Sequence, residues 1–481
     1  MIFSSLNFFL FFSAFYLLYL FCRLPYQNWL LVAGSLIFYA SFDWRLPLLL
    51  SILTFGTFYT VKTIADTEIK EEKKNLLFLA IAINIGTLCV FKYFNFFAPS
   101  FVKILSSLNI PLQSKALSLA VPVGLSFYVF QNIGYALDIY RGSIKPEQKL
   151  ADYFLYISFF PKLIAGPIER AANFLPQVKK REKLSSADLH LSGFLILWGL
   201  YQKVSISHSL GQIVDSSYKQ LSSLSSIEAL VCAYAFAFQL YLDFAGYSNM
   251  ARGISILLGF KIMENFKNPF FATDLLEFWK RWHISLTSWL RDYIFYPFFF
   301  NCKNIVLASM LVFFLNGIWH GATLNFAIMG LYWGMAVSIT TLINTRKRKS
   351  NTYSASQPSG LKWLLLVLFT FHLNCIGFLL FRSQSLQEIT SIFARLLALD
   401  FKLNEQLIQN IGLMLFMLCP LLVIEFFQFR KDDTACLIKL RPFHQFLLAS
   451  FLFFQALSAY MYSPEPLLQN SDRQEFVYFR F

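Results

Sequence analysis

The longest uncharged stretch of the chain is the feature that most limits how it can fold. No Asp, Glu, Lys or Arg occurs between Lys303 and Arg346. One helical crossing of a bilayer takes about 20 apolar residues, so this stretch is long enough for two crossings. His320 lies inside it, in the segment NGIWHGA at residues 316–322. An ionisable side chain in hydrocarbon is costly and usually faces a cavity or a partner, which makes His320 a candidate functional residue.

The surroundings of His320 favour a chemical role. Histidine exchanges a proton near neutral pH, so His320 is a candidate catalytic base. Asn316 lies four residues earlier, and a continuous helix would place both side chains on one face, where Asn316 could orient the imidazole. Trp319 is a second supporting residue. The alternative is a neutral histidine that is only hydrogen-bonded between packed helices.

Composition extends the membrane interpretation to the whole chain. The 481 residues are 57% hydrophobic and only 14% charged, whereas soluble domains carry roughly 25% charged residues. The apolar runs predict an all-α, polytopic integral membrane protein with about 11–13 transmembrane helices plus re-entrant or interfacial segments. We expect one integral domain over residues 1–481, with a motif-bearing core at about 116–345 and peripheral helices at 1–98 and 361–462. Residues 1–22 are expected to be the first retained helix rather than a signal peptide.

The net charge of +14 does not indicate nucleic-acid binding, because the basic residues cluster in short segments between apolar runs. That pattern is typical of the positive-inside rule and of contact with anionic lipids. It predicts that residues 62–74, 141–149, 346–349 and 430–441 are cytoplasmic and that both termini are extracytoplasmic. The seven cysteines are scattered without a CxxC pair, so neither a disulfide framework nor a zinc site is expected.

Residues 159–170 (FFPKLIAGPIER) contain two prolines, a glycine and three charges between apolar runs. Broken backbone at membrane depth is tolerated only against protein or a watery cavity. The segment is interpreted as a re-entrant wall of a substrate path, with a surface connector as the alternative. Asp243 places a carboxylate in another apolar run, where a structural role as a hydrogen-bond acceptor is favoured over direct substrate binding.

Residues 277–293 (EFWKRWHISLTSWLRDY) predict an amphipathic interfacial helix. Trp282, Leu286 and Trp289 would share one face, with a basic side formed by Lys280, Arg281 and Arg291. In the functional interpretation these three cations form a basic lip that receives an anionic donor, such as a coenzyme A nucleotide. In the alternative interpretation the helix lies on the membrane surface and His283 has no functional role.

Together these segments resemble the membrane-bound O-acyltransferase (MBOAT) family, in particular its bacterial alginate and peptidoglycan O-acetyltransferase-like branch. The resemblance is carried by PKLIAGP at 161–167, DFAGYSNM at 243–250, residues 277–293, NGIWHGA at 316–322 and the ending EFVYFRF at 475–481. One departure is that Pro297 is followed by Phe298-Phe299-Phe300-Asn301, where many relatives have a glycine-containing turn.

The resemblance implies a ring of helices around a central tunnel in a bacterial inner membrane. It implies that His320 is the catalytic histidine and that His283 is a second functional histidine toward the cytoplasm. Acetyl-CoA would be the donor, with no bound cofactor or metal. The acceptor would be a separate extracytoplasmic partner of the SGNH (serine-histidine esterase-like) class, which passes the acetyl group to an envelope polysaccharide.

Two other functions fit the same sequence pattern. A transporter or flippase would use His320 and Asp243 as a proton relay. A membrane scaffold for envelope enzymes would need neither His320 nor His283.

Overall fold

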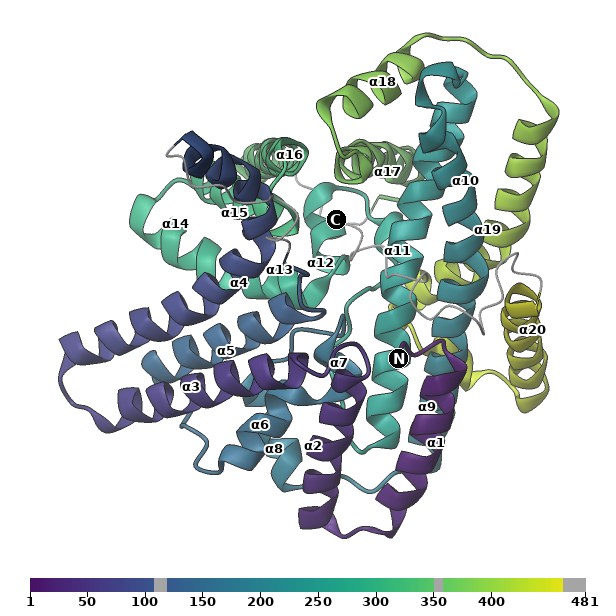
Figure 1. The fold of residues 1–481 in the computed structure, drawn as a ribbon. Coiled ribbons are helices and arrows are strands. Elements are labelled where there is room, and N and C mark those ends of the chain that lie inside the picture. The colour runs from purple at the N-terminus through teal and green to yellow at the C-terminus, as the bar shows by residue number, and fades with distance from the viewer. Residues whose placement is uncertain (108–118, 350–357, 462–481) are drawn as a thin grey trace. The chain divides into compact units, whose positions relative to one another are not determined.

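The chain folds into helices. The computed structural model in Figure 1 describes residues 1–107, 119–349 and 358–461, and these residues form helices but no strands. Among them, six helices are long and apolar enough to cross a membrane. These are α3 (Leu46–Asp66), α4 (Lys70–Ser107), α11 (Ser226–Leu257), α16 (Leu324–Lys349), α17 (Gly360–Arg382) and α19 (Glu405–Lys431). The chain is therefore an all-α, polytopic integral membrane protein, as the sequence predicts.

The finer membrane predictions are not decided by these helices. Two more apolar helices, α1 (Leu6–Phe21) and α15 (Ile305–His320), have 16 residues each, fewer than a simple crossing needs. The total of 11–13 crossings and the central tunnel stay predictions. The terminal segment 475–481 and the proposed outside position of the C-terminus lie beyond the described residues.

The described chain divides into two compact units. The first contains Met1–Gly193 and Met250–Met263, and the second contains Phe194–Asn249 and the described chain from Glu264 onward. The single domain expected over residues 1–481 stays a prediction.

The first unit is built on a group of neighbouring helices. Helices α3, α4 and α5 contact one another and run side by side (Figure 1). Tyr39 of α2 is fully buried and donates from its hydroxyl to the Val123 carbonyl at 2.7 Å, which ties α2 to the start of α5. The other helices of this unit are α1, α2 (Leu24–Ala40), α5 (Leu125–Tyr140), α6 (Leu150–Ser158), α7 (Phe160–Leu163), α8 (Ala171–Lys179) and the start of α9 (Ser186–Leu200).

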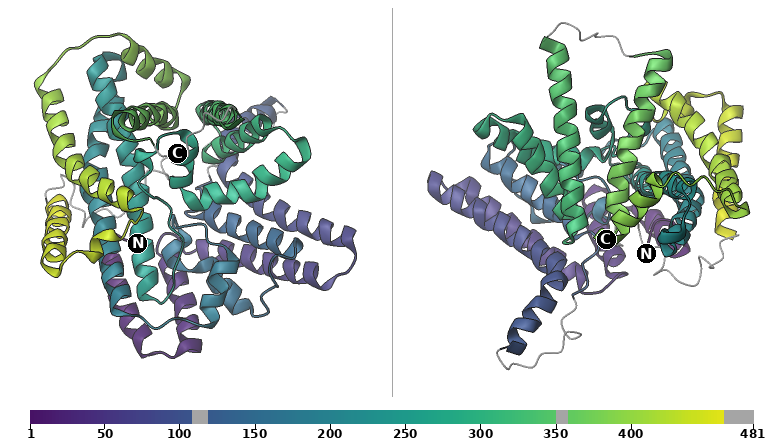
Figure 2. Two further views of the ribbon diagram at one scale, coloured as in Figure 1. Left: turned by 180° about the vertical axis from the view of Figure 1, so that it is seen from behind. Right: turned by 90° about the horizontal axis from the view of Figure 1, so that it is seen from above.

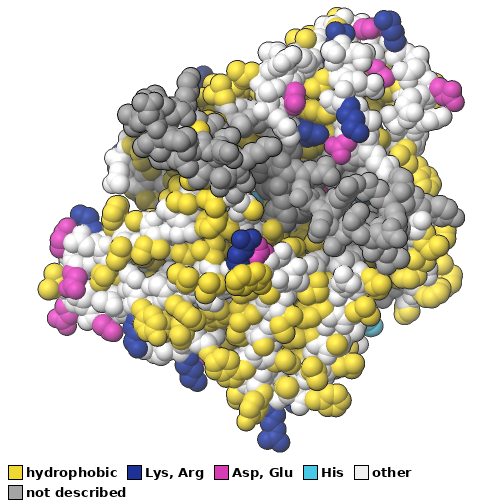
Figure 3. Space-filling view, in the orientation of Figure 1, with side chains coloured by type: hydrophobic (Ala, Val, Ile, Leu, Met, Phe, Trp, Pro, Cys, Tyr) yellow, Lys and Arg dark blue, Asp and Glu magenta, His cyan; other side chains and the backbone are white. Residues whose placement is uncertain are grey.

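The surface of the first unit is suited to lipid. Hydrophobic side chains cover it over α1, α2 and α3, whereas charged side chains gather at the turn between α3 and α4 (Figure 3). Leu10, Leu18 and Ile52 are each about 60% exposed. Exposed apolar helix faces of this kind are stable in hydrocarbon but costly in water.

The second unit contains three of the segments that resemble the acyltransferases, namely residues 243–249, 277–293 and 316–322, whereas residues 161–167 lie in the first unit. Helices α15, α16 and α17 pack in succession, and Figure 2 (right) shows α16 and α17 as neighbouring long helices that come together at one end. Its other elements are the end of α9, the π-helix η2 (Tyr201–Ser207), α10 (His208–Lys219), α12 (Leu275–Arg281), α13 (Ile284–Leu290), the π-helix η5 (Arg291–Phe295), α14 (Tyr296–Cys302), α18 (Leu386–Leu397) and α20 (Pro442–Met461), with short 3-10 turns η3 (Leu221–Ser223), η4 (Pro269–Phe271) and η6 (Cys436–Lys439).

Candidate active site

His320 is the last residue of α15. The helix begins where the Asn304 side chain accepts hydrogen bonds from the backbone N–H groups of Val306 and Leu307, at 3.0 and 3.1 Å. It is continuous to His320, and Asn316 and His320 are both buried. The structure therefore confirms that the two residues share a helix and both face the protein interior.

Aromatic rings surround the imidazole. The Trp319 ring lies 4.5 Å from the His320 ring between centroids, and the Phe381 ring of α17 lies 5.1 Å away at 84°, an edge-to-face contact. Phe326 of α16 lies 6.3 Å away and also contacts Phe381. These contacts limit the rotation of the ring. His320 as a whole residue is 9% exposed.

The position of His320 depends on a close contact between α15 and α16. A Cβ atom at Gly317, one turn before His320, would lie 2.9 Å from the Gly330 Cα and closer still to the Phe326 carbonyl oxygen. A Cβ atom at Gly330 would lie 2.6 Å from the Phe313 carbonyl oxygen. Glycine at both positions lets the two backbones approach, as small residues do in membrane helix pairs.

His283 does not lie within a helix, which corrects the predicted continuous helix over residues 277–293. Helix α12 ends at Arg281, and α13 begins at Ile284. His283 between them has φ 42° and ψ 54°, a left-handed conformation that is uncommon for residues other than glycine. Its side chain is 1% exposed, and burial lowers the pKa of the imidazole to about 3. His283 is therefore a buried, neutral histidine at neutral pH.

The break at His283 is stabilised by hydrogen bonds to the backbone segment at residues 265–267. The Ile284 N–H donates to the Asn265 carbonyl at 2.9 Å, and the Lys267 N–H donates to the Arg281 carbonyl at 3.0 Å. The Asn265 side chain accepts from the Ser285 hydroxyl at 2.6 Å. These bonds satisfy backbone groups that the helix would otherwise use. The sequence reasoning missed Asn265, which no local pattern marks.

The prediction that Trp282, Leu286 and Trp289 form an apolar face at the membrane interface is also wrong. Trp282, Leu286 and Trp289 are buried within the protein at 3–4% exposure rather than presented to the bilayer. The Trp282 ring packs 5.1 Å from Phe266 and 5.0 Å from Phe378. The helical spacing of these residues reflects packing against other protein segments.

The three predicted donor-binding cations differ in their surroundings. Lys280 is exposed. Arg281 forms an ion pair with Glu277 at 3.0 Å and donates to the Lys267 carbonyl at 3.1 Å, so its guanidinium is engaged in the fold. Arg291 is exposed and pairs with Asp292 at 2.8 Å. The donor-binding role of the three stays a prediction.

Asp243 lies in α11 and forms a buried ion pair with Lys203 of η2. The side chains are 7% and 10% exposed, so the pair is shielded from solvent. Gly246 faces the same π-helix, because a Cβ atom there would lie 3.0 Å from the Lys203 backbone nitrogen. This geometry fits the structural role favoured for Asp243. Lys203 was missed, since it lies 40 residues away in the sequence.

A second buried carboxyl group was also missed. Glu425 in α19 is 1% exposed and accepts a hydrogen bond from the Tyr241 hydroxyl at 2.7 Å. One turn later, the Gln428 side chain accepts from the Asn268 amide at 2.9 Å. Two polar residues one turn apart in an apolar run were the signal that could have found this network.

Residues 159–170 belong to the first unit, and 159–169 are buried with Arg170 partly buried, which rules out the surface-connector alternative. Lys162 is fully buried, donates to the Gln131 side chain and lies 4.8 Å from the Tyr156 ring centroid. Glu169 accepts from the Asn173 amide at 2.8 Å and from the Met263 N–H. Lys162 and Glu169 therefore have hydrogen-bond partners inside the protein core. The role of the segment as the wall of a substrate path stays a prediction.

The departure after Pro297 has a local structural outcome. Pro297 is near the start of α14, where proline is tolerated, and the phenylalanines continue that helix to Cys302. The turn comes at Lys303, with φ 54°, immediately before the Asn304 cap of α15. The turn before α15 is therefore built without glycine.

The fold and the site define a polytopic, all-helical membrane protein whose buried histidines lie in packed, apolar surroundings. Comparison with known proteins gives the family. Residues 147–382 match the membrane-bound O-acyltransferase family. The chain is 33% identical over 417 residues to a probable alginate O-acetylase of Pseudomonas putida, covering 84% of this chain and 82% of the relative.

Two further relatives act on other envelope polymers by name. A peptidoglycan O-acetyltransferase of Helicobacter pylori is 32% identical over 400 residues, covering 77% of this chain and 73% of the relative. A teichoic acid D-alanyltransferase of Bacillus subtilis is 30% identical over 274 residues, covering 54% of this chain and 69% of the relative. The chain belongs to the membrane-bound O-acyltransferase family and is an integral membrane acyltransferase.

Proposed function

We propose that this acyltransferase moves an acetyl group from cytoplasmic acetyl-CoA to a hydroxyl group on a separate extracytoplasmic protein of the SGNH class, in the bacterial inner membrane. The partner would then O-acetylate an envelope polysaccharide. The names of two relatives support an O-acetyl product, because they are an alginate O-acetylase and a peptidoglycan O-acetyltransferase. Acetyl-CoA is the donor substrate, and no bound cofactor is needed.

The observation that carries the proposal is the position of His320. It ends an uncharged helix, is held by rings from α16 and α17, and keeps 9% of its surface exposed. A neutral imidazole in such a place can accept a proton from an alcohol as the alcohol oxygen attacks the thioester carbonyl.

Collapse of the tetrahedral intermediate breaks the C–S bond. The thiolate of coenzyme A leaves readily because a thiol has a pKa of about 8.5, and it takes up the proton that His320 accepted from the alcohol. Asn316, one turn before His320 in the same helix, is assigned a supporting role, and Trp319 packs beside the imidazole. His283, with Lys280, Arg281 and Arg291 in the same part of the chain, is assigned to the donor.

The test uses purified protein in lipid vesicles with labelled acetyl-CoA and a soluble acceptor carrying a primary hydroxyl. We expect His320→Ala to lower acetyl transfer by about 10²–10⁴-fold, the usual contribution of a general base, while the protein stays folded. His444→Ala is the matched control, because His444 is exposed. Transfer by His320→Ala at the wild-type rate would contradict the base assignment. Substrate uptake without release of coenzyme A would favour the transporter instead.

A further inference from the structure

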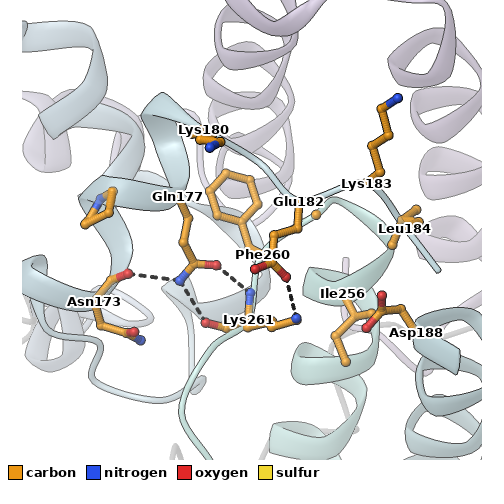
Figure 4. Close-up of a pocket in the computed structure, with 12 residues that line it drawn as sticks. Asn173, Gln177, Lys180, Glu182, Lys183, Leu184, Asp188, Ile256, Phe260 and Lys261 are labelled. Atoms are coloured by element: carbon orange, nitrogen blue, oxygen red, sulfur yellow. Dashed lines mark hydrogen bonds and ion pairs between the residues drawn. The ribbon is translucent and has the colours of Figure 1, made fainter.

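The first unit contains a cleft of about 560 Å³ that the acyltransferase chemistry does not use (Figure 4). It is formed by the end of α8, the connector from there into α9, the last turn of α11 and the chain that follows α11, all within one unit. Gln177 fixes one wall, because its amide accepts from the Lys261 N–H at 2.7 Å and donates to the Lys261 carbonyl at 3.0 Å. The wall is therefore built by specific hydrogen bonds.

The lining of this cleft is amphipathic. Pro176, Leu184, Ile256 and Phe260 supply apolar surface, and Leu184 is 36% exposed. A ligand that only carried charge would leave this apolar surface in contact with water, whereas one with an apolar part would cover it.

The cations at the rim outnumber the acids that could neutralise them. Glu182 pairs with Lys261 at 2.6 Å, and Asp188 accepts from the Ser185 hydroxyl at 2.6 Å. Lys180 and Lys183 are exposed, and within the described part of the chain neither forms an ion pair. Figure 4 draws both lysines outside its network of dashed contacts. Two positive charges without ion-pair partners among the described residues thus border the apolar part of this amphipathic cleft.

Contacts of the adjoining loop place the cleft beside the turn between α1 and α2. The Arg181 guanidinium donates to the Tyr19 hydroxyl at 2.6 Å and to Gln27 at 3.0 Å. The first turns of α2 expose Tyr26 and Trp29 at 68% and 63%. Exposed tyrosine and tryptophan favour the boundary between lipid and water.

An ion pair also indicates which side of the membrane the cleft faces. Lys179 pairs with Glu147 at 2.7 Å, and Glu147 lies in the basic segment 141–149 that the positive-inside rule predicts to be cytoplasmic. The cytoplasmic leaflet is the one that carries anionic lipids in many membranes.

We infer that this cleft binds an anionic phospholipid. The lipid phosphate lies between Lys180 and Lys183, and the glycerol and first methylenes cover Leu184, Ile256 and Phe260. A phosphate ester with an apolar substituent could also come from a soluble nucleotide thioester. The neighbouring exposed aromatics favour the lipid.

The test measures binding of phosphatidylglycerol to the full-length protein in detergent, by native mass spectrometry and by the shift in melting temperature, with zwitterionic phosphatidylcholine, which has no net charge, as the comparison. Lys180→Gln with Lys183→Gln should weaken phosphatidylglycerol binding about 30-fold, because each basic residue near anionic lipid contributes roughly fivefold. Lys180→Arg with Lys183→Arg should retain it.

The matched control is Lys70→Gln with Lys74→Gln at the α3–α4 turn, which removes the same charge away from the cleft. Equal binding of phosphatidylglycerol and phosphatidylcholine would overturn the inference, as would equal losses in the two glutamine variants. Loss of coenzyme A binding with phosphatidylglycerol binding intact would assign the cleft to the nucleotide. All these variants change exposed lysines, so their melting temperatures without lipid report directly on folding.

Discussion

Alanine at Gly330 should disturb catalysis without touching the candidate base. Gly330 lies in α16 and faces α15, the helix that ends at His320. A Cβ atom there would lie 2.6 Å from the Phe313 carbonyl oxygen and 2.9 Å from the Phe314 Cα, whereas ordinary contact begins at 3.4 Å. Both neighbours are backbone atoms and cannot rotate away. The helices must therefore separate by about 0.8 Å.

The size of the effect follows from this displacement. Overpacking of a filled interior costs about 1–3 kcal/mol of stability. A shift of about 1 Å in a catalytic group can reduce turnover by about 100-fold. We therefore expect Gly330→Ala to lower the rate of acyl transfer by about 10–100-fold while the variant still folds. Gly317→Ala should act in the same direction, since it meets the same contact from α15.

The assay is release of coenzyme A from acetyl-CoA by purified protein, with melting temperature measured alongside. Gly56→Ala is the matched control, because Gly56 also lies in a membrane helix and a Cβ atom there meets nothing within 4 Å. Wild-type rates in both Gly330→Ala and Gly317→Ala would refute the argument that the α15–α16 contact positions His320. A loss of equal size in Gly56→Ala would show that the effect is not specific.

Three further predictions concern the second unit. Lys203→Met leaves Asp243 buried without its ion-pair partner and should destabilise the protein by about 3–5 kcal/mol in thermal unfolding, and Lys203→Met with Asp243→Leu should recover part of that loss. Because burial lowers the pKa of His283 to about 3, the neutral form is favoured in the folded state. The stability associated with neutral His283 is complete above its unfolded-state pKa of about 6.5 and is lost as pH falls below that value, by at most about 1.4 kcal/mol per pH unit. His283→Asn should therefore make the melting temperature depend less on pH between 6.5 and 5 than in the wild type. Parallel melting-temperature curves for the two proteins would contradict this. Asn265→Ala removes the side-chain acceptor for Ser285, which helps to hold the backbone break at His283. If His283 serves the donor, this variant should raise KM for acetyl-CoA more than it lowers kcat. An unchanged KM would argue against that role.

The parts of the fold that the sequence predicts are those set by local composition. Uncharged runs predicted the membrane helices, because hydrocarbon excludes unpaired charge and unsatisfied backbone. The spacing of Asn316 and His320 predicted their shared helix, because that spacing depends only on helix geometry. Both predictions rest on short-range rules.

The features that the sequence did not predict depend on distant residues. Nothing in residues 277–293 marks a break at His283, since neither glycine nor proline occurs there. The break is stabilised by hydrogen bonds from the Asn265 segment. The same spacing of Trp282 and Leu286 suits a lipid-facing or a protein-facing side, and only their neighbours decide between the two. The structural role of Lys203 likewise follows only from its ion pair with Asp243.

The Lys203–Asp243 pair has a consequence for how the protein is made. Each residue alone would be a bare charge in the bilayer, which is costly enough to oppose release of its segment from the insertion machinery. Lys203 is synthesised first, and α11 must follow before the charge is neutralised. We therefore expect the segment that carries Lys203 to become stable in the membrane only after α11 has also emerged from the ribosome.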